Sequence, residues 1–384
     1  LTTHRLGKSV PLTIDASSVN IVKPFLNDPR PEAVLYTLDI LEQSDENRVV
    51  REALPGLLEH RSVKVRLAAL ERIEQLKLGA ALTSVRYLVQ TEPDAHVREY
   101  ALRALTALDG QKALEIAARH MDAPETPVRR GALVGLLRYG GPQAKAQAED
   151  RLMQLVESGT PDNRELAAQI LKETGQRHHT PLLLKLLGST SPKVRLAALS
   201  AVQQLNDPQV WPLVVQAVTD PTTRSQAITA LIAGGSASMP SIRSAVESVQ
   251  TPREVMMALA RVCGKIGGHE ALNTLRLLIT APDPEVRTAS LAGLSTCGYR
   301  SDEREAILDL VHEEANTFTT LLAIRRDLSS SEEVTLLNTA LDKLMLLAQE
   351  RMLYLLSFIY DAEPVNRARE ALMLGWEQLR AMSL

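Results

Sequence analysis

Aromatic residues are scarce in this sequence. Phe, Trp and Tyr together make up 3% of 384 residues, so we do not expect the aromatic-rich core of a large β-sandwich or barrel. Hydrophobic residues at 45% and charged residues at 23% are ordinary for a folded chain and exclude wholesale disorder. The composition therefore predicts a folded protein with a largely aliphatic core.

Cysteines and long apolar runs are also few. Two cysteines, Cys263 and Cys297, without a CxxC pair, exclude a disulfide framework and favour a reducing, cytoplasmic compartment. The most apolar run, residues 352–360, is far shorter than the ~20 residues of a membrane helix, so we predict no membrane span in this chain. Residues 1–25, which begin with Leu, lack a signal-peptide core, and we interpret the chain as a fragment of a longer protein.

No excess of positive charge is present. Lys and Arg number 43 against 46 Asp and Glu, a net charge of −3, so we expect no nucleic-acid partner. Residues 301–384 differ, with 8 basic and 15 acidic side chains, a net charge of −7. We interpret this stretch as a solvated helix surface, with an acidic docking patch as the alternative.

What the sequence does contain is an internal repeat, marked by an arginine that follows a turn. Successive arginines lie a mean of about 32 residues apart, which is room for two short helices and two turns. Such a unit is too small to fold alone, so each unit must pack on its neighbours. The repeat arginines are Arg66, Arg98, Arg129, Arg164, Arg195, Arg224, Arg253 and Arg287.

The segment after each arginine has the pattern of a helix with one buried stripe. Counted from the residue before the arginine, positions +4, +5, +8 and +11 are apolar or small in almost every copy. A ninth copy, with Val34 in the arginine position, precedes the others in register. Position +4 is the smallest, which favours close helix packing; it is held by Ala69, Ala101, Ala132, Ala167, Ala198, Ala227, Met256 and Ser290.

Helix starts are predicted where a side-chain oxygen precedes a proline. Thr160-Pro161, Ser191-Pro192, Asp220-Pro221 and Asp283-Pro284 each combine an N-cap residue with proline at the first helical position. No segment shows sustained strand alternation. We predict an all-α fold, an α-solenoid of about nine short HEAT/ARM-like helical repeats over residues 26–300, with a leader at 1–25 and a C-terminal helical cap or extension at 301–384.

The repeat resembles the HEAT family, in particular its short form called PBS-lyase HEAT-like repeats. The strings that carry this resemblance are SPKVRLAALSAV (191–202) and DPEVRTASLAGL (283–294). The resemblance implies a non-catalytic protein-interaction scaffold or regulatory protein that binds a protein partner. A chromophore (bilin) lyase is the alternative that the same family implies.

The two ends of the chain resemble a more specific group. DPRPEAVLYTLDILEQ (28–43) and ERMLYLLSFIYDAEPVNRAREAL (350–372) are similar to the edges of the HEAT segment in bacterial proteins that join a nucleotide-transporter-like membrane domain to a cyclic-nucleotide-binding domain. This resemblance implies a cytoplasmic connector whose partners are those adjoining domains. Neither domain is present in this chain.

Candidate chemical groups favour structure over catalysis. Eight arginines in register could bind phosphates or acidic peptides, but hydrogen bonds to turn carbonyls or capping carboxylates are the stronger interpretation. The pairs His269-Glu270 and His312-Glu313 are two, whereas HEAT-like di-iron hydroxylases carry four. We therefore predict no enzyme activity, no catalytic, cofactor-binding or metal-binding residue, and no cofactor.

Aromatic residues gather near the C-terminus. Residues 341–384 hold four of the twelve aromatics, Tyr354, Phe358, Tyr360 and Trp376. Tyr354 and Phe358 are four residues apart and would share a helix face. These residues either belong to a helix that caps the open end of the solenoid or form a surface on which a partner docks.

Overall fold

The computed structural model describes residues 19, 21–43, 47–205, 207–328 and 335–382, without the side chains of 47 and 373–382. Regular structure in these ranges is helical throughout and includes no strand. Helices alternate in two layers, and nine of the described helices, α2, α4, α6, α8, α10, α12, α14, α16 and α18, correspond to the nine predicted copies. The predicted all-α solenoid is confirmed.

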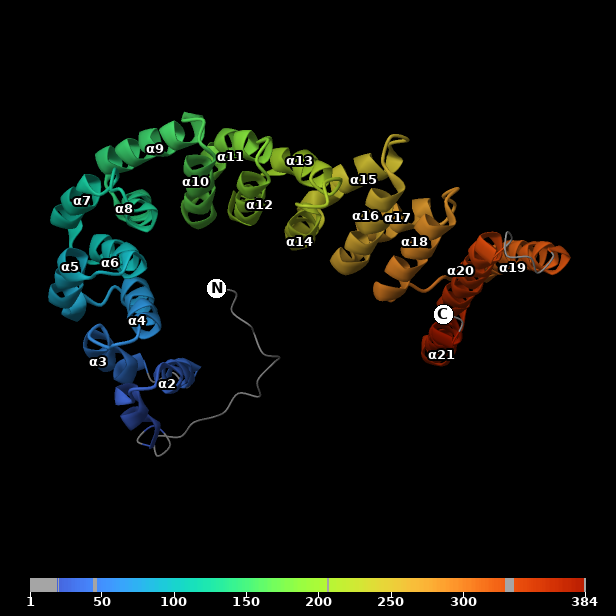
Figure 1. Ribbon diagram of the computed structural model, residues 1–384, viewed down its shortest axis with the longest axis horizontal. Helices are drawn as coiled ribbons and strands as arrows, with labels where there is room; N and C mark the ends of the chain where they lie inside the picture. The colour runs from blue at the N-terminus through green and yellow to red at the C-terminus, as the bar shows by residue number, and fades with distance from the viewer. Residues whose placement is uncertain (1–18, 20, 44–46, 206, 329–334, 383–384) are drawn as a thin grey trace. The chain divides into compact units, whose positions relative to one another are not determined.

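The chain divides into two compact units, Leu1–Gln176 and Arg177–Leu384. In unit 1 the helices that carry the repeat arginines, together with α2, form a second-helix layer on the inner side of an arc, and the other helices form a first-helix layer outside it (Figure 1). The second helices are α2 (Pro31–Gln43), α4 (Val63–Leu76), α6 (Ala95–Leu108), α8 (Thr126–Tyr139) and α10 (Pro161–Thr174). The others are η1 (Lys23–Asn27), α3 (Asn47–Leu57), η2 (Gly79–Ala81), α5 (Leu82–Thr91), α7 (Gly110–Arg119) and α9 (Pro142–Glu157).

Unit 2 repeats this arrangement and adds three long helices. Its second-helix layer is α12 (Pro192–Leu205), α14 (Arg224–Gly234), α16 (Arg253–Ile266) and α18 (Pro284–Thr296). Its first-helix layer is η3 (Arg177–His179), α11 (Thr180–Leu187), η4 (Pro208–Val210), α13 (Trp211–Gln216), η5 (Gly235–Ser238), α15 (Met239–Glu247) and α17 (Gly268–Leu278). After these come α19 (Arg304–Asp327), α20 (Thr335–Ile359) and α21 (Ala362–Met382).

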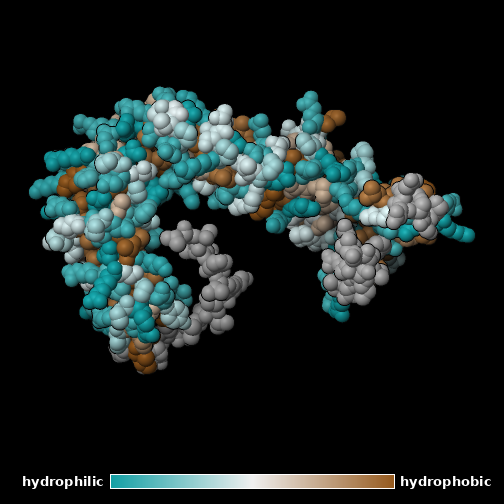
Figure 2. All heavy atoms as spheres, in the orientation of Figure 1, coloured by the Kyte–Doolittle hydropathy of each residue, from teal (hydrophilic) through white to brown (hydrophobic). Residues whose placement is uncertain are grey.

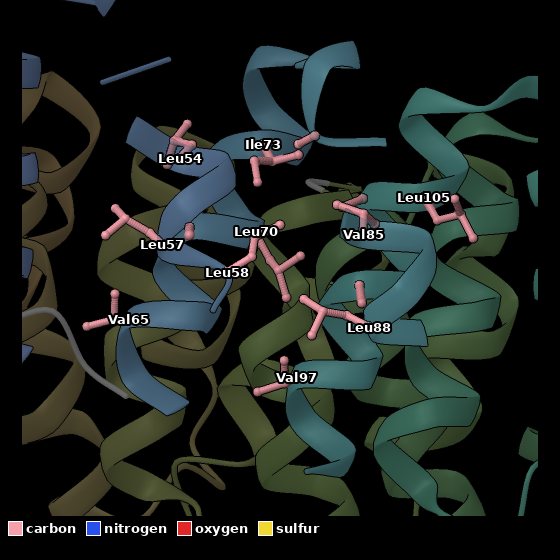
Figure 3. Close-up of a cluster of buried hydrophobic side chains, with 14 of the residues drawn as sticks. Leu54, Leu57, Leu58, Val65, Leu70, Ile73, Val85, Leu88, Val97 and Leu105 are labelled. Carbon is pink, nitrogen blue, oxygen red and sulfur yellow. The ribbon is translucent and has the colours of Figure 1, made fainter. Parts of the chain in front are cut away.

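In each unit the core is the aliphatic seam between its two layers. All six alanines at position +4 are fully buried, so the small position lies where second helices approach one another. In unit 1, Leu54 of α3, Leu70 of α4 and Val85 of α5 come from three helices and point into one cluster (Figure 3). Each repeat of unit 1 therefore buries its apolar stripe against the neighbouring repeats, as the sequence analysis predicts for a repeat too small to fold alone.

Two pairs of second helices approach especially closely through glycine. A Cβ on Gly131 of α8 would lie 2.4 Å from the backbone oxygen of Glu99 in α6, and a Cβ on Gly264 of α16 would lie 2.8 Å from the Cα of Gly293 in α18. No other residue fits at such distances without a shift of backbone. Glycine therefore draws these helices together in both units.

Three of the four predicted Pro starts agree with the structure. Helices α10, α12 and α18 begin at the expected prolines, and the Asp283 carboxylate accepts hydrogen bonds from the backbone N–H groups of Glu285 and Val286. The prediction for Asp220-Pro221 is wrong, because α14 begins three residues later, at Arg224. The Asp220 carboxylate instead accepts from the backbone and hydroxyl of Thr222 and closes a turn.

The C-terminal helices are anchored on the last repeat by a buried arginine. Arg351 of α20 is 1% exposed and donates to Glu314 of α19 at 2.6 Å and to the backbone oxygen of Pro284 in α18 at 3.3 Å. The Arg287 guanidinium lies 3.4 Å from the same Glu314 carboxylate. Helices α18, α19 and α20 thus share one charged junction inside unit 2. The proposed limits 1–25, 26–300 and 301–384 stay a prediction.

Candidate functional site

The repeat arginines are engaged along the edge where one repeat meets the next. Arg66 donates to the backbone oxygen of His60 at 2.9 Å and to the Glu92 carboxylate of the following repeat at 2.8 Å. Arg98 reaches Glu125 in the same way, at 3.0 Å. These hydrogen bonds satisfy turn carbonyls and join neighbouring repeats.

The remaining copies follow this pattern with variations. Arg164, Arg195, Arg224 and Arg287 donate to carbonyls of their own preceding turns, and Arg195 also pairs with Asp220 of the next turn. Arg253 lies 3.9 Å from Asp283, and Arg129 donates to Thr126 at 3.2 Å. An external anion at these positions would have to displace bonds within the chain.

A network of ion pairs covers the second-helix layer of unit 1. The Glu74 carboxylate, on α4, accepts from Arg103 of α6 at 3.0 Å and from Arg138 of α8 at 2.8 Å. Arg103 also donates to Glu173 of α10 at 2.9 Å, and the Tyr139 hydroxyl donates to Glu74 at 3.0 Å. Four successive second helices are thereby joined through charged side chains.

The same face carries a second cluster. Glu99 of α6 is fully buried and accepts from Arg130 of α8 at 2.7 Å, while another nitrogen of Arg130 donates to the Gln169 side chain of α10 at 2.8 Å. We name both clusters together the unit 1 ion network: Glu74, Glu99, Arg103, Arg130, Arg138, Tyr139, Gln169 and Glu173. Its three glutamates and three arginines balance in charge.

Burial shapes the titration of this network. Removal from water, and then the neighbouring Glu74 carboxylate, raise the pKa of Tyr139 above its ordinary value of 10. Tyr139 therefore stays a neutral hydrogen-bond donor through the physiological range. A charge-balanced and internally bonded face has little left with which to attract a charged partner.

The second-helix layer of unit 2 is hollowed instead. A groove of about 540 Å³ lies across α14, α16 and α18. We name it the α14–α18 groove; its lining consists of Arg224, Ile228, Ile232, Glu254, Met257, Ala258, Arg261, Val262, Lys265, Ala292, Gly293 and Thr296. Figure 2 shows hydrophobic atoms among hydrophilic ones on this layer of unit 2. The groove falls in the volume range of about 300–1,000 Å³ typical of binding pockets.

Charge in the groove is distributed unevenly. Arg224 donates to the backbone oxygen of Val218 at 2.9 Å and lies 3.7 Å from Glu254, so its charge is engaged. Arg261 and Lys265 are exposed, and within the part of the chain that the structure describes neither has a carboxylate within 4 Å. Two positive charges therefore border an aliphatic hollow.

The sequence prediction did not find either surface. Their residues lie at positions such as +2, +6, +9 and +10, opposite the buried stripe, and differ in type from copy to copy. At those positions charged residues recur in unit 1, whereas Ile, Ala and Thr occur in unit 2. This difference between copies is the signal in the sequence that could have indicated the two surfaces.

The C-terminal aromatics separate by exposure. Tyr354 and Phe358 are buried inside unit 2, where Phe358 meets the Tyr299 ring edge-on at 5.3 Å. They present no surface to a partner, whereas Tyr360 is 44% exposed and accepts from Arg304 at 2.6 Å. The side chain of Trp376, in α21, lies outside what the structure describes.

The two His-Glu pairs lie on different helices of unit 2. His269 and Glu270 stand exposed at the start of α17, and His312 and Glu313 are exposed on α19.

Among the described residues no helix is both long and apolar enough to cross a membrane.

A family model of HEAT repeats matches residues 50–138, 149–232 and 219–295, which is more than half of the chain. The chain belongs to the HEAT-repeat family. As in a HEAT protein, paired helices stack in two layers, and the matched residues include the unit 1 ion network except Tyr139, and the α14–α18 groove except Thr296. No curated protein matches the chain.

Solved HEAT-like structures are similar at low identity. Human deoxyhypusine hydroxylase in complex with glycerol is 18% identical over 73% of this chain and 96% of its own, with a TM-score of 0.32. Kap121p bound to RanGTP is 13% identical over 94% of this chain and 46% of its own, with a TM-score of 0.45. Importin beta is 13% identical over 88% and 47%, with a TM-score of 0.34. The chain spans less than half the length of the last two.

Proposed function

We propose that this HEAT-repeat chain is a non-catalytic protein-interaction scaffold, and that it serves as a cytoplasmic connector between a membrane transporter domain and a cyclic-nucleotide-binding domain. The observation that supports a scaffold is that its repeat arginines are engaged in bonds within the chain, at the edge where repeats meet. Repeat arginines bond between repeats, as Arg66 does with Glu92, and leave the second-helix layers as the broad surfaces. In unit 2 that layer holds an open groove across three repeats.

The connector role rests on the resemblance of residues 28–43 and 350–372 to the edges of such a segment. It is tested by the gene that encodes the chain. We expect membrane spans upstream of Leu1 and a cyclic-nucleotide-binding module downstream of Leu384. Reading frames of any other kind on both sides would overturn the connector role and leave the scaffold standing.

The alternative of a bilin lyase is tested with the purified chain and a linear tetrapyrrole. A scaffold leaves the visible spectrum of the tetrapyrrole unchanged on mixing. Stoichiometric uptake with a new visible absorption band would overturn the scaffold. Substituting both thiols, Cys263→Ser and Cys297→Ser, would then show whether uptake is covalent, because a thioether needs a cysteine.

A further inference from the structure

We propose that the α14–α18 groove binds an acidic, aliphatic segment of a partner protein, with aliphatic side chains in the hollow and carboxylates against Arg261 and Lys265. This inference rests on the proposed scaffold function and names where the partner is held and by what chemistry. It follows from the shape of the groove, from its lining and from its uncompensated charge.

Small residues make the hollow. Ala258 of α16 and Ala292 and Gly293 of α18 lie along it, between the larger side chains of Ile232, Met257 and Val262. Gly264 and Gly293 bring α16 and α18 close, so the floor is continuous backbone and methyl groups. Such a surface accepts branched aliphatic side chains and offers few polar partners.

The two cations select the charge of the occupant. Arg261 and Lys265 are one helical turn apart on α16, so they project on the same side. Arg261 stands at position +9 of its repeat, where Glu74 stands in unit 1. Its counterparts at +9 in the flanking helices are Ile232 and Ser295, which are uncharged.

The contrast with unit 1 supports a partner protein as the source of the carboxylates that would pair with Arg261 and Lys265. On that face Glu74 finds Arg103 and Arg138 on the next helices. In the groove no described residue of the chain supplies the corresponding carboxylate to Arg261 or Lys265, and we assign it to the partner. An aliphatic hollow bordered by cations matches a peptide with alternating acidic and aliphatic residues, in the groove-binding manner of amphipathic segments.

The test uses random 12-residue peptides displayed on phage and selected on the full chain. We expect enriched peptides that combine Asp or Glu with Leu, Ile or Val. A synthetic peptide from the enriched set should bind less tightly at high salt, since the pairs with Arg261 and Lys265 are exposed. Enrichment of basic peptides, or of none, would overturn the proposal.

Variants locate the binding. Arg261→Glu with Lys265→Glu should weaken the peptide by about tenfold or more through charge reversal, and Thr296→Trp should weaken it by filling the groove from an exposed position. Arg243→Glu, on the first-helix layer at α15, is the matched control and should leave affinity unchanged. Unchanged melting of all variants by circular dichroism shows that they fold.

The outcomes separate this inference from the proposed function. Peptide binding that ignores the groove variants would overturn the groove and leave the scaffold intact. A change of oligomeric state in the groove variants, seen by light scattering without peptide, would show that a second copy of the chain is the occupant and overturn the partner assignment. Tetrapyrrole uptake is the separate result that would remove the scaffold itself.

Discussion

The second-helix layers of unit 1 and unit 2 are built on the same repeat but carry different outward residues. In unit 1, Glu74 and Glu173 pair with Arg103 and Arg138 across successive helices, so these charges cancel. In unit 2 the equivalent surface is a groove lined by Ile232, Ala292 and two cations of α16. The difference teaches that a solenoid can join the outward side chains of one stretch by ion pairs and leave another stretch open without altering its backbone pattern.

Among the substitutions considered, removal of the Glu74 carboxylate should lower the free energy of unfolding most, because it disrupts the ion pairs that distinguish unit 1 from unit 2. Glu74→Ala leaves the nearly buried Arg103 with one fewer carboxylate and removes an acceptor from Arg138 and Tyr139. Loss of one partner in a buried ionic group costs about 3–5 kcal/mol. Urea unfolding followed by circular dichroism should show this loss.

The control for that variant is an exposed pair in unit 2. Glu247→Ala removes the partner of Arg243, whose side chain is 57% exposed. Such exposed pairs contribute little to stability, because water screens their charges. If Glu74→Ala proved as mild as this control, the unit 1 ion network would not stabilise its unit and the comparison would fail.

Glycine substitutions should affect both units alike. A Cβ on Gly135 would lie 2.4 Å from the Thr106 hydroxyl, and one on Gly293 would lie 2.8 Å from a Leu275 methyl and 2.9 Å from the Ala260 oxygen. We expect Gly135→Val and Gly293→Val each to lower stability by about 1–3 kcal/mol through overpacking. Thermal melting measures both.

A glycine with free space around it provides the contrast. Gly56 of α3 is exposed, and a Cβ added to it would have no heavy atom of another part of the chain within 4 Å. Gly56→Ala should therefore stabilise by about 0.5–1 kcal/mol, the ordinary helix preference. Destabilisation by this change as large as that of Gly293→Val would show that close helix approach is not the cause.

The two thiols report on packing of the α16 and α18 layer. Burial raises the pKa of Cys263 to about 12, whereas Cys297 is half-buried. In the unfolded chain the Cys263 thiol has its ordinary pKa near 9, whereas in the folded chain its pKa is about 12. Between these two pH values the unfolded chain loses the thiol proton more readily, so the free energy of unfolding falls as the pH rises from 9 to 12. At pH 8 we expect iodoacetamide to modify Cys297 first, as read by peptide mass spectrometry.

Cys263→Ala sharpens this test. Stability of the original chain should fall more steeply between pH 9 and pH 11 than that of the variant, because the variant lacks the buried thiol. Equal slopes, or rapid modification of Cys263 at pH 8, would mean that this layer opens readily.

Neutralising Glu254 should have the smallest effect on stability. Its carboxylate is exposed and lies 3.7 Å from Arg224, so Glu254→Gln should change unfolding by less than about 1 kcal/mol. The groove would gain net positive charge, and an acidic peptide selected on the chain should bind more tightly in isothermal titration. Weaker binding would contradict the charge assigned to the groove.

Much of the fold follows from local pattern. Alanine at +4, exemplified by Ala69 and Ala198, is where the second helices meet, and both are fully buried. Start signals were less secure, since Asp220 forms a turn with Thr222 while Arg224 begins the helix. The side chain of a capping residue can serve either structure, and here the Asp220 carboxylate also accepts a hydrogen bond from Arg195.

The candidate sites were much less predictable. Tyr354 and Phe358 share a helix face, as their spacing indicates, but spacing alone does not say whether that face meets α18 or a partner. Both proved buried. Likewise Glu74 and Arg138 are 64 residues apart, and only the stacking of α4, α6 and α8 brings them to 2.8 Å.

By itself, then, the order of residues determined the second helices and the register of the repeat, because apolar periodicity and small side chains act within about one turn and one neighbouring helix. Tertiary structure alone decided which outward charges pair and which stay open. That choice depends on atoms brought together from neighbouring repeats or from repeats two apart, where a carboxylate either meets a guanidinium within hydrogen-bond distance or leaves it facing water.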